Sequence, residues 1–288
     1  MNIRAGFLYT VGKYGDLPTL DNIKMALSEL RKIGFPCCEL EGRTKSHLRM
    51  LEENKGSLRD HCEGLGIKVI NFVMMLPGTS SLNPDEQKDA VEQFRDASKL
   101  AKFFGCETME MDSYSAALTY SCDPMETTNL KTKVPQGYSW DFQWKSFVNN
   151  VDEYAKVAAD VGCKLQLHPR IGELVCNTDS MLRLRDAVKN ENLGFIFDTA
   201  QLHAQKEILP LSAIKLQGYI RCLHLSDNDG NAHLHKRLGQ GTIDWDGIIA
   251  VLRQHLFEWN IAVDIANFGE IEEDYIASLE FINNKLIG

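Results

Sequence analysis

The feature that most constrains this chain is a repeated alternation of two kinds of segment. A polar stretch with helical periodicity ends at a glycine, and a short apolar or β-branched run follows at once; this occurs at residues 30–34 into 37–40, 62–66 into 68–72, 101–105 into 107–111, and 158–162 into 164–168. A glycine just past a helix supplies the left-handed residue that other side chains resist. Strand runs that alternate with helices predict βαβ units and a parallel sheet.

The same pattern extends over the whole chain. Further strands are predicted at residues 3–9, 193–198, 219–226 and 260–265, which brings the total to eight. Helices are predicted at residues 19–33, 44–65, 84–104, 140–161, 177–190, 206–217, 244–256 and 270–286. Eight strand–helix pairs over 288 residues favour an α/β fold of one domain, residues 1–288, closed as a (β/α)8 or TIM barrel.

An open, doubly wound sheet is the alternative architecture. Such a sheet requires a glycine-rich, phosphate-binding turn after its first strand. The segment Val11-Gly12-Lys13-Tyr14-Gly15 matches this motif only weakly. Residues 113–139 form one long predicted connection between a strand and a helix. Loops of this length are commonly lids or binding loops, so we expect a lid here.

Composition and charge exclude several classes of protein. No apolar run approaches the roughly 20 residues that span a bilayer, and the amino-terminal residues lack the charge pattern of a signal peptide. The eight cysteines include no Cys-x-x-Cys pair, which fits a reduced, cytoplasmic location. A net charge of −9, with 40 acidic against 31 basic residues, argues against a nucleic-acid surface.

Four residues with metal-binding side chains follow apolar runs on four consecutive predicted strands. His168 ends the fifth strand and Asp198 the sixth, while the seventh carries His224 and the eighth Asp264. In a barrel, polar side chains at the carboxyl ends of the strands converge on one site. Nitrogen and oxygen donors together suit Mn²⁺, Co²⁺, Zn²⁺, Fe²⁺ or Mg²⁺, so this set predicts a divalent-metal site. The competing interpretation, that each residue is a strand-end cap or a satisfied core histidine, does not explain why all four coincide.

Two other groups of polar residues could contribute to such a site. Glu39 and Glu41 alternate within the second strand, as Glu110 and Asp112 do within the fourth, so one member of each pair could act as an acid or base or merely join a hydrogen-bond network. Residues 228–237 form a polar and basic stretch directly after the His224 strand. This stretch is either a solvated loop or a source of substrate contacts from His235, Lys236 or Arg237.

Several segments resemble motifs of a known family. Residues 198–202 (Asp-Thr-Ala-Gln-Leu), 224–228 (His-Leu-Ser-Asp-Asn) and 238–245 resemble three consecutive motifs of the sugar phosphate isomerase/epimerase family, the xylose-isomerase-like barrels. Residues 34–39 and 165–169 are similar to that family's signatures on its second and fifth strands. The resemblance implies a Mn- or Mg-type ion, metal ligands at His168, Asp198, His224 and Asp264, and polyhydroxylated substrates such as ketoses, keto-inositols, keto-glycosides and hydroxypyruvate.

The chain departs from the family pattern at three places. Epimerases of the family usually have glutamate where this chain has His168 and Asp264, and those glutamates also transfer protons. Gln201 replaces a usual substrate-binding histidine. Arg170 follows the strand-five proline, where the inosose-dehydratase-like subgroup has a second histidine. These departures argue against simple epimerisation by two glutamates but leave the predicted metal site in place.

The sequence therefore predicts a metal-dependent isomerase or epimerase of a sugar, keto-sugar or related polyol, with Mn²⁺ as the preferred ion. A metal-bound carbonyl would lose a neighbouring proton to a base, for which Asp264, Glu110 and His168 are the candidates. The predicted substrate-binding residues are Arg170, Gln201, His235 and Arg237.

The rival predictions are a dehydratase or lyase acting on a keto-inositol or keto-glycoside, an abasic-site endonuclease, and a metal-free partner subunit. The negative charge and few histidines speak against the endonuclease. The expected partner is a small polyhydroxylated substrate, with neither nucleic acid nor membrane, and the sequence is compatible with a homo-oligomer.

Overall fold

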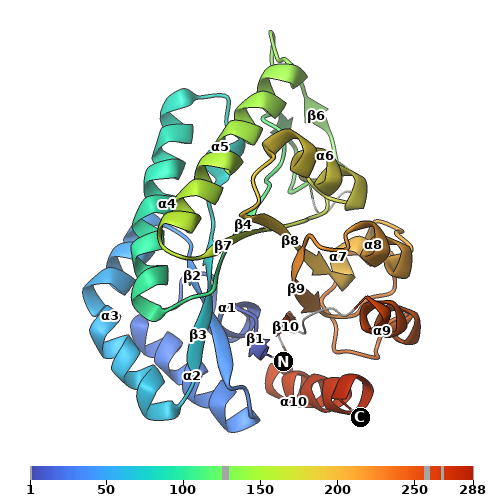
Figure 1. Ribbon diagram of the computed structural model, residues 1–288. Helices are drawn as coiled ribbons and strands as arrows, with labels where there is room; N and C mark the ends of the chain where they lie inside the picture. Colours follow the sequence, from blue (N-terminus) through green and yellow to red (C-terminus); the bar gives the residue numbers. More distant parts are fainter. Residues whose placement is uncertain (1, 125–129, 256–259, 267–268, 288) are drawn as a thin grey trace.

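The computed structural model describes the chain except for residues 1, 125–129, 256–259, 267–268 and 288. The strands that build the main sheet are β1 (Asn2–Ala5), β2 (Cys37–Gly42), β3 (Lys68–Met74), β4 (Thr108–Asp112), β7 (Lys164–His168), β8 (Leu193–Asp198), β9 (Ile220–Leu225) and β10 (Asn260–Val263). They pair in parallel and close in the order β1-β10-β9-β8-β7-β4-β3-β2. This closed barrel confirms the fold predicted from the alternating pattern (Figure 1).

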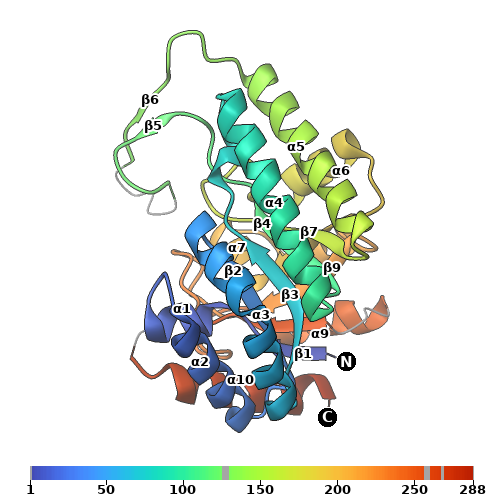
Figure 2. The same cartoon turned by 90° about the vertical axis from the view of Figure 1, so that its left-hand side faces the viewer.

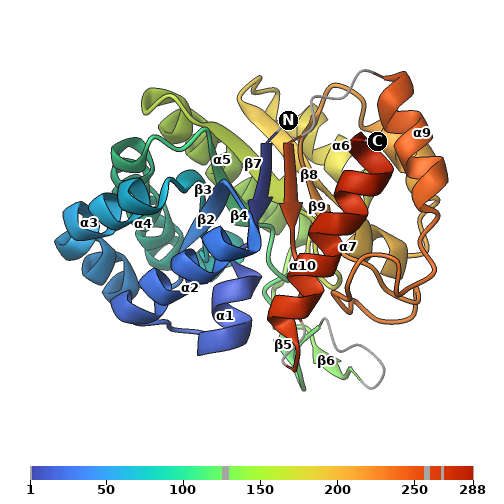
Figure 3. The ribbon, with the colours of Figure 1, turned by 90° about the horizontal axis from the view of Figure 1, so that it is seen from below.

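Helices surround the barrel. They are α1 (Leu8–Tyr14), α2 (Leu20–Ile33), α3 (Lys45–Leu65), the short η1 (Pro77–Ser80), α4 (Pro84–Phe104), α5 (Trp140–Asp160), α6 (Thr178–Val188), α7 (Thr199–Ala204), α8 (Leu209–Lys215), α9 (Trp245–Gln254), α10 (Ile271–Ile282) and the terminal turn η3 (Asn283–Ile287). Figure 3 shows α3, α4 and α5 on one side of the molecule and α9 and α10 on the other. In the part of the chain described, no helix is both long and apolar enough to cross a membrane.

The local sequence explains where these helices begin and end, as α4 illustrates. Asn83 caps its first turn by accepting a hydrogen bond from the Asp85 N–H, and Pro84 occupies the first helical position. Gly105 ends the helix at a φ of 73°, and its N–H bonds to the Ala101 carbonyl. Only glycine adopts this left-handed conformation without strain, so the glycines of the repeated pattern do mark helix ends.

The first predicted strand is wrong over its second half. The strand ends at Ala5, and the chain turns into α1, so Tyr9 is helical. Gly6 lies at this turn and fits closely against β10, because a Cβ there would lie only 2.5 Å from Asp264 Oδ1. The Phe7 N–H leaves the strand ladder and donates to Glu39 Oε2 at 3.2 Å. An apolar run of this length fits a strand or a buried helix equally well, and the tertiary contacts decide.

Two other segments also differ from the prediction. The helix expected at residues 206–217 is the shorter α8, with Pro210 in its first turn, and an additional short helix that was not predicted, α7, precedes it directly after β8. The long connection at residues 113–139 contains a small antiparallel hairpin of β5 (Thr119–Tyr120) and β6 (Thr132–Lys133). Figure 2 shows this hairpin standing out from the barrel, far from α10.

The apolar core lies between the barrel wall and the helices, where Phe72, Phe94, Phe147 and Phe195 are fully buried. Much of the inside of the barrel is polar instead. Six side chains that strand alternation directs inward are almost completely buried there: Arg4, Glu39, Asn71, Thr108, Glu110 and Gln166. Buried polar groups are costly unless they are paired, so the barrel interior is built as a hydrogen-bonded network on which the site rests.

Candidate active site

The four residues predicted as metal ligands lie at the carboxyl ends of four adjacent strands. His168 is the last residue of β7, Asp198 is the last of β8, His224 is in β9, and Asp264 directly follows β10. The register pairs Asp198 with His224 across β8 and β9. All four are buried, with exposed fractions between 0 and 4%. The structure thus brings these side chains together, and their binding of a metal stays a prediction.

His168 is held between carboxylates. Its Nε2 lies 2.8 Å from Asp198 Oδ2, and its Nδ1 lies 3.4 Å from Asp112 Oδ1. Burial alone would lower the pKa of this imidazole, but the hydrogen bonds with Asp112 and Asp198 raise it to about 10. In this arrangement His168 is a charged donor that orients Asp198.

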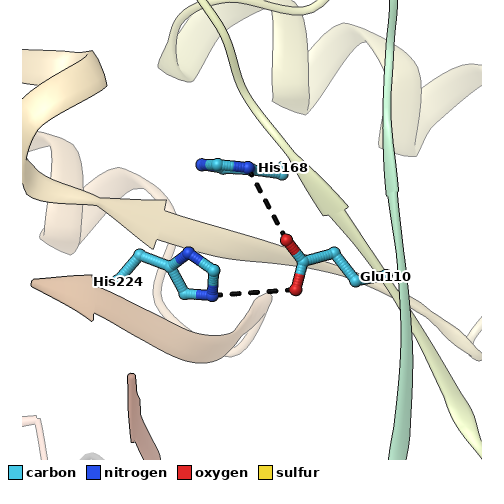
Figure 4. Close-up of side chains that lie close together, drawn as sticks. All are labelled: Glu110, His168 and His224. Carbon is cyan, nitrogen blue, oxygen red and sulfur yellow. Dashed lines mark ion pairs between the residues drawn. The ribbon is translucent and has the colours of Figure 1, made fainter. Parts of the chain in front are cut away.

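His224 has a different environment. Its Nε2 lies 3.7 Å from Glu110 Oε2, and its Nδ1 lies 3.6 Å from Asp264 Oδ2, so neither nitrogen makes a hydrogen bond to the described residues. Figure 4 shows Glu110 between the two imidazoles, with its other oxygen 3.6 Å from His168 Nδ1. Burial raises the pKa of Glu110 to about 7, and the charge of His224 opposes that rise. Glu110, His168 and His224 could together hold a metal ion.

Asp264 faces a second imidazole, that of His235. The His235 Nδ1 lies 3.4 Å from Asp264 Oδ2 and is hydrogen bonded to the Asp264 carbonyl at 3.0 Å. An isolated bridge between Asp227 and Lys236 places His235 there by folding the polar loop back over the end of β9. Burial opposes ionisation of Asp264, but the nearby imidazoles of His224 and His235 hold its pKa well below the ordinary value. Asp198, His235 and Asp264 form the second group of donors that could hold a cation.

Several buried nitrogen and oxygen atoms of the site make no hydrogen bond to the described residues. They are both ring nitrogens of His224, both carboxylate oxygens of Asp264, Oε1 of Glu110 and Oε1 of Gln166. Leaving such atoms unsatisfied costs about 1–3 kcal/mol each, so they point to a cation, water or substrate that completes them. The donor set, which combines carboxylate, imidazole and amide oxygen, fits a divalent metal.

Gln166 is the residue of this set that the sequence analysis missed. It lies two positions before His168 on β7, fully buried, and its Nε2 donates to Asn71 Oδ1 at 3.1 Å and to Glu110 Oε2 at 3.3 Å. These two acceptors fix the orientation of the amide and leave its oxygen free. The alternation of side chains along a strand, counted back from His168, would have located it.

A buried ion pair between Arg4 and Glu39 lies beneath the site. Arg4 Nε lies 2.5 Å from Glu39 Oε1, and both side chains are fully buried. Burial would raise the pKa of Glu39, but the Arg4 guanidinium lowers it to about 2. Asn71 then connects the pair to the site, because its Nδ2 donates to Glu39 at 3.0 Å and to Glu110 at 2.7 Å.

The predicted substrate-binding residues are not all in one place. Arg170 donates to Asp112 Oδ2 at 2.8 Å, and the Gln201 amide lies 3.3 Å from His235 Nε2, so both lie beside the residues described above. Arg237 instead lies 3.7 Å from Asp274 in α10. Their roles toward a substrate stay predictions.

The long connection after β4 passes near the same residues. Adding a Cβ to Gly172, in the loop after β7, would place it 2.7 Å from the Pro124 carbonyl. Asp123, in the same connection, lies close enough to His233 in the loop after β9 for its charge to act on that imidazole. Burial lowers the pKa of His233, whereas the charge of Asp123 raises it. The segment therefore lies at the carboxyl ends of the strands, which is the position expected of a lid. Its movement stays a prediction, and residues 125–129 lie outside the described part of the chain.

Comparisons with known proteins agree with this architecture. Residues 27–285 match the model of the xylose isomerase-like TIM barrel family. An uncharacterized protein of Methanocaldococcus jannaschii is 26% identical over 164 residues, which cover 50% of this chain and 54% of that protein, so the match spans about half the length of this curated relative.

Two solved structures share the fold over nearly the whole chain. One is 3-keto-D-glucoside 4-epimerase from E. coli, with 15% identity, a TM-score of 0.76 and 99% of each chain covered. The other is the IolI protein with a bound zinc atom, with 19% identity, a TM-score of 0.73, and 99% of this chain and 98% of that one covered. The closed barrel and the family match over residues 27–285 together show that this chain belongs to the xylose isomerase-like TIM barrel family.

Proposed function

We propose that this protein is a divalent-metal-dependent isomerase or epimerase that acts on a sugar, keto-sugar or related polyol by removing a proton next to a carbonyl. The observation that carries the proposal is the set of buried, unpartnered donor atoms on His224, Asp264, Glu110 and Gln166. The epimerase activity named for one structural neighbour and the zinc bound by another support it.

The metal would be held by Asp198, His224 and Asp264, three of the four ligands predicted from the sequence. For the fourth position we favour the Gln166 oxygen over His168, because both nitrogens of His168 already face carboxylates. A bound divalent ion, with Mn²⁺ as first choice, would supply Lewis acidity toward a carbonyl oxygen. His168 then acts as a positioning residue that holds Asp198 in place.

Glu110 is the proposed base. Its Oε1 is unpartnered and buried, and it lies outside the proposed ligand set. The Asn71 and Gln166 amides both donate to its other oxygen, which fixes the carboxylate plane. A base that is already oriented removes a substrate proton without first being reorganised. Asp264, the alternative base, would lose basicity if it bound the metal.

The test has two parts. Elemental analysis and calorimetric titration with Mn²⁺, Mg²⁺ and Co²⁺ should show a bound ion in the wild type and a large loss of affinity in His224→Ala and Asp198→Asn proteins. Incubation of keto-sugars and inososes in D₂O should then show metal-dependent deuterium exchange next to the carbonyl. A purified protein that binds no divalent ion would favour the metal-free partner subunit instead.

A further inference from the structure

The long connection after β4 begins with a fastened stem, residues 113–118, and continues as an arm, residues 119–124. At the start of the stem, the Glu173 carboxylate accepts hydrogen bonds from the Ser113 N–H at 3.0 Å, the Ser113 hydroxyl at 2.9 Å and the Tyr114 N–H at 2.8 Å. Tyr114 has a φ of 60°, in the left-handed region that residues other than glycine resist, so this turn needs support from outside. Glu173 supplies that support from the loop after β7 and fixes the first turn of the connection.

The arm packs on the same loop through a contact that only a glycine permits. A Cβ on Gly172 would lie 2.7 Å from the Pro124 carbonyl oxygen and 2.8 Å from the Pro124 Cβ. Real Cβ atoms do not approach other atoms so closely, so Pro124 packs directly against the bare backbone of Gly172. The φ of Gly172, 80°, also favours glycine. The loop after β7 therefore offers the arm a docking point that has no side chain.

This docking point lies beside the proposed metal site. It follows the carboxyl end of β7, on the substrate-binding side of a barrel. Burial lowers the pKa of His233, in the loop after β9, while the charges of Asp123 in the arm and of Asp198 act in the opposite direction. Because charges shift a pKa in this way only from nearby, the arm and the proposed metal ligand Asp198 both lie close to the same imidazole.

We propose that the arm is a lid that is held closed by docking on Gly172, and that it controls the access of the divalent ion and the substrate to the proposed metal site. The stem fixes one end of this lid, so that opening requires only that the arm leave Gly172. A closed lid would keep water away from the proposed proton transfer. The control of access rests on the proposed function, whereas the docking of the arm does not.

Hydrogen–deuterium exchange followed by mass spectrometry measures the docking without any substrate. In Gly172→Ala, the amides of residues 119–123 should exchange about 10- to 100-fold faster than in the wild type, because a methyl group is forced into a close contact. Pro124→Gly, which loosens the same contact from the side of the arm, should also speed the exchange. Thermal unfolding checks that both variants are folded.

Gly162→Ala is the matched control. Gly162 has a φ of 84°, so alanine meets the same backbone strain as at Gly172, but a Cβ there meets nothing within 4 Å. The arm of this variant should exchange at the wild-type rate. Equal exchange of the arm in the two alanine variants would overturn the docking of the arm on Gly172, and with it the lid.

A second measurement tests the control of access. Mn²⁺ bound to each protein is challenged with EDTA, and its release is followed by electron paramagnetic resonance. A lid changes the rates of binding and release by the same factor, so Gly172→Ala should release Mn²⁺ about 10-fold faster, with a calorimetric Kd within about 2-fold of the wild type. Gly162→Ala should match the wild type in both. A faster-exchanging arm with unchanged Mn²⁺ release would reject the control of access, while a wild type that binds no Mn²⁺ would count against the proposed function and the role that rests on it.

Discussion

The imidazole Nε2 of His168 lies 2.8 Å from Asp198 Oδ2, on the neighbouring strand. This contact predicts that His168 supports the metal site from outside it. We expect His168→Gln to lower the affinity for Mn²⁺ by roughly 10- to 100-fold, as replacement of outer partners of metal ligands commonly does. Calorimetric titration measures this directly. Complete loss of binding would show instead that His168 is itself a ligand, as the sequence analysis predicted.

Gln166→Glu should have the opposite effect. Its unpartnered oxygen lies in the proposed ligand set, and a carboxylate there adds a negative charge without changing the size of the side chain. We expect tighter Mn²⁺ binding and a more stable metal-bound protein. The comparison with Gln166→Leu, which removes the donor, separates the effect of charge from that of shape. Unchanged affinity in both variants would place Gln166 outside the metal site.

Gly6→Ala should damage the site through Asp264. The added Cβ would lie 2.5 Å from Asp264 Oδ1 and 2.9 Å from the Val263 carbonyl, so the carboxylate or the backbone must shift. We expect weaker metal binding in calorimetric titration. The matched control is Gly56→Ala in the middle of α3, where a Cβ meets nothing within 4 Å; there we expect wild-type metal binding and a gain of about 0.5–1 kcal/mol in stability.

His47 should make the protein sensitive to acid. Burial lowers the pKa of this imidazole below its ordinary value of 6.5, and the nearby Arg43 acts in the same direction. Its contribution to stability is therefore present above pH 6.5 and is lost as the pH falls below that value. In urea unfolding at pH 7.5 and 5.0, the wild type should lose more stability than His47→Gln. Equal losses in the two proteins would contradict this assignment.

The sequence was sufficient for most of the fold and for the core of the site. Strand periodicity and the glycine-terminated helices predicted the barrel, and the strand-end rule brought His168, Asp198, His224 and Asp264 to one place. The first strand was predicted to run to Tyr9, although it ends at Ala5 and α1 begins at Leu8, because a short apolar run does not distinguish strand from helix. Strand alternation could place Gln166 on the same face as His168, but a neutral amide becomes a metal-ligand candidate only when its surroundings leave its oxygen unpaired.

The buried pair of Arg4 and Glu39 has a consequence for how this barrel can change during evolution. Asn71 links that pair to Glu110, so the proposed base is held by buried side chains of β1, β2 and β3. A substitution at Arg4 or Asn71 could retune the proton affinity of the base while leaving the groups that recognise the substrate untouched. The proton affinity of the base and the recognition of the substrate would thus depend on different side chains, so that one could change in evolution without the other.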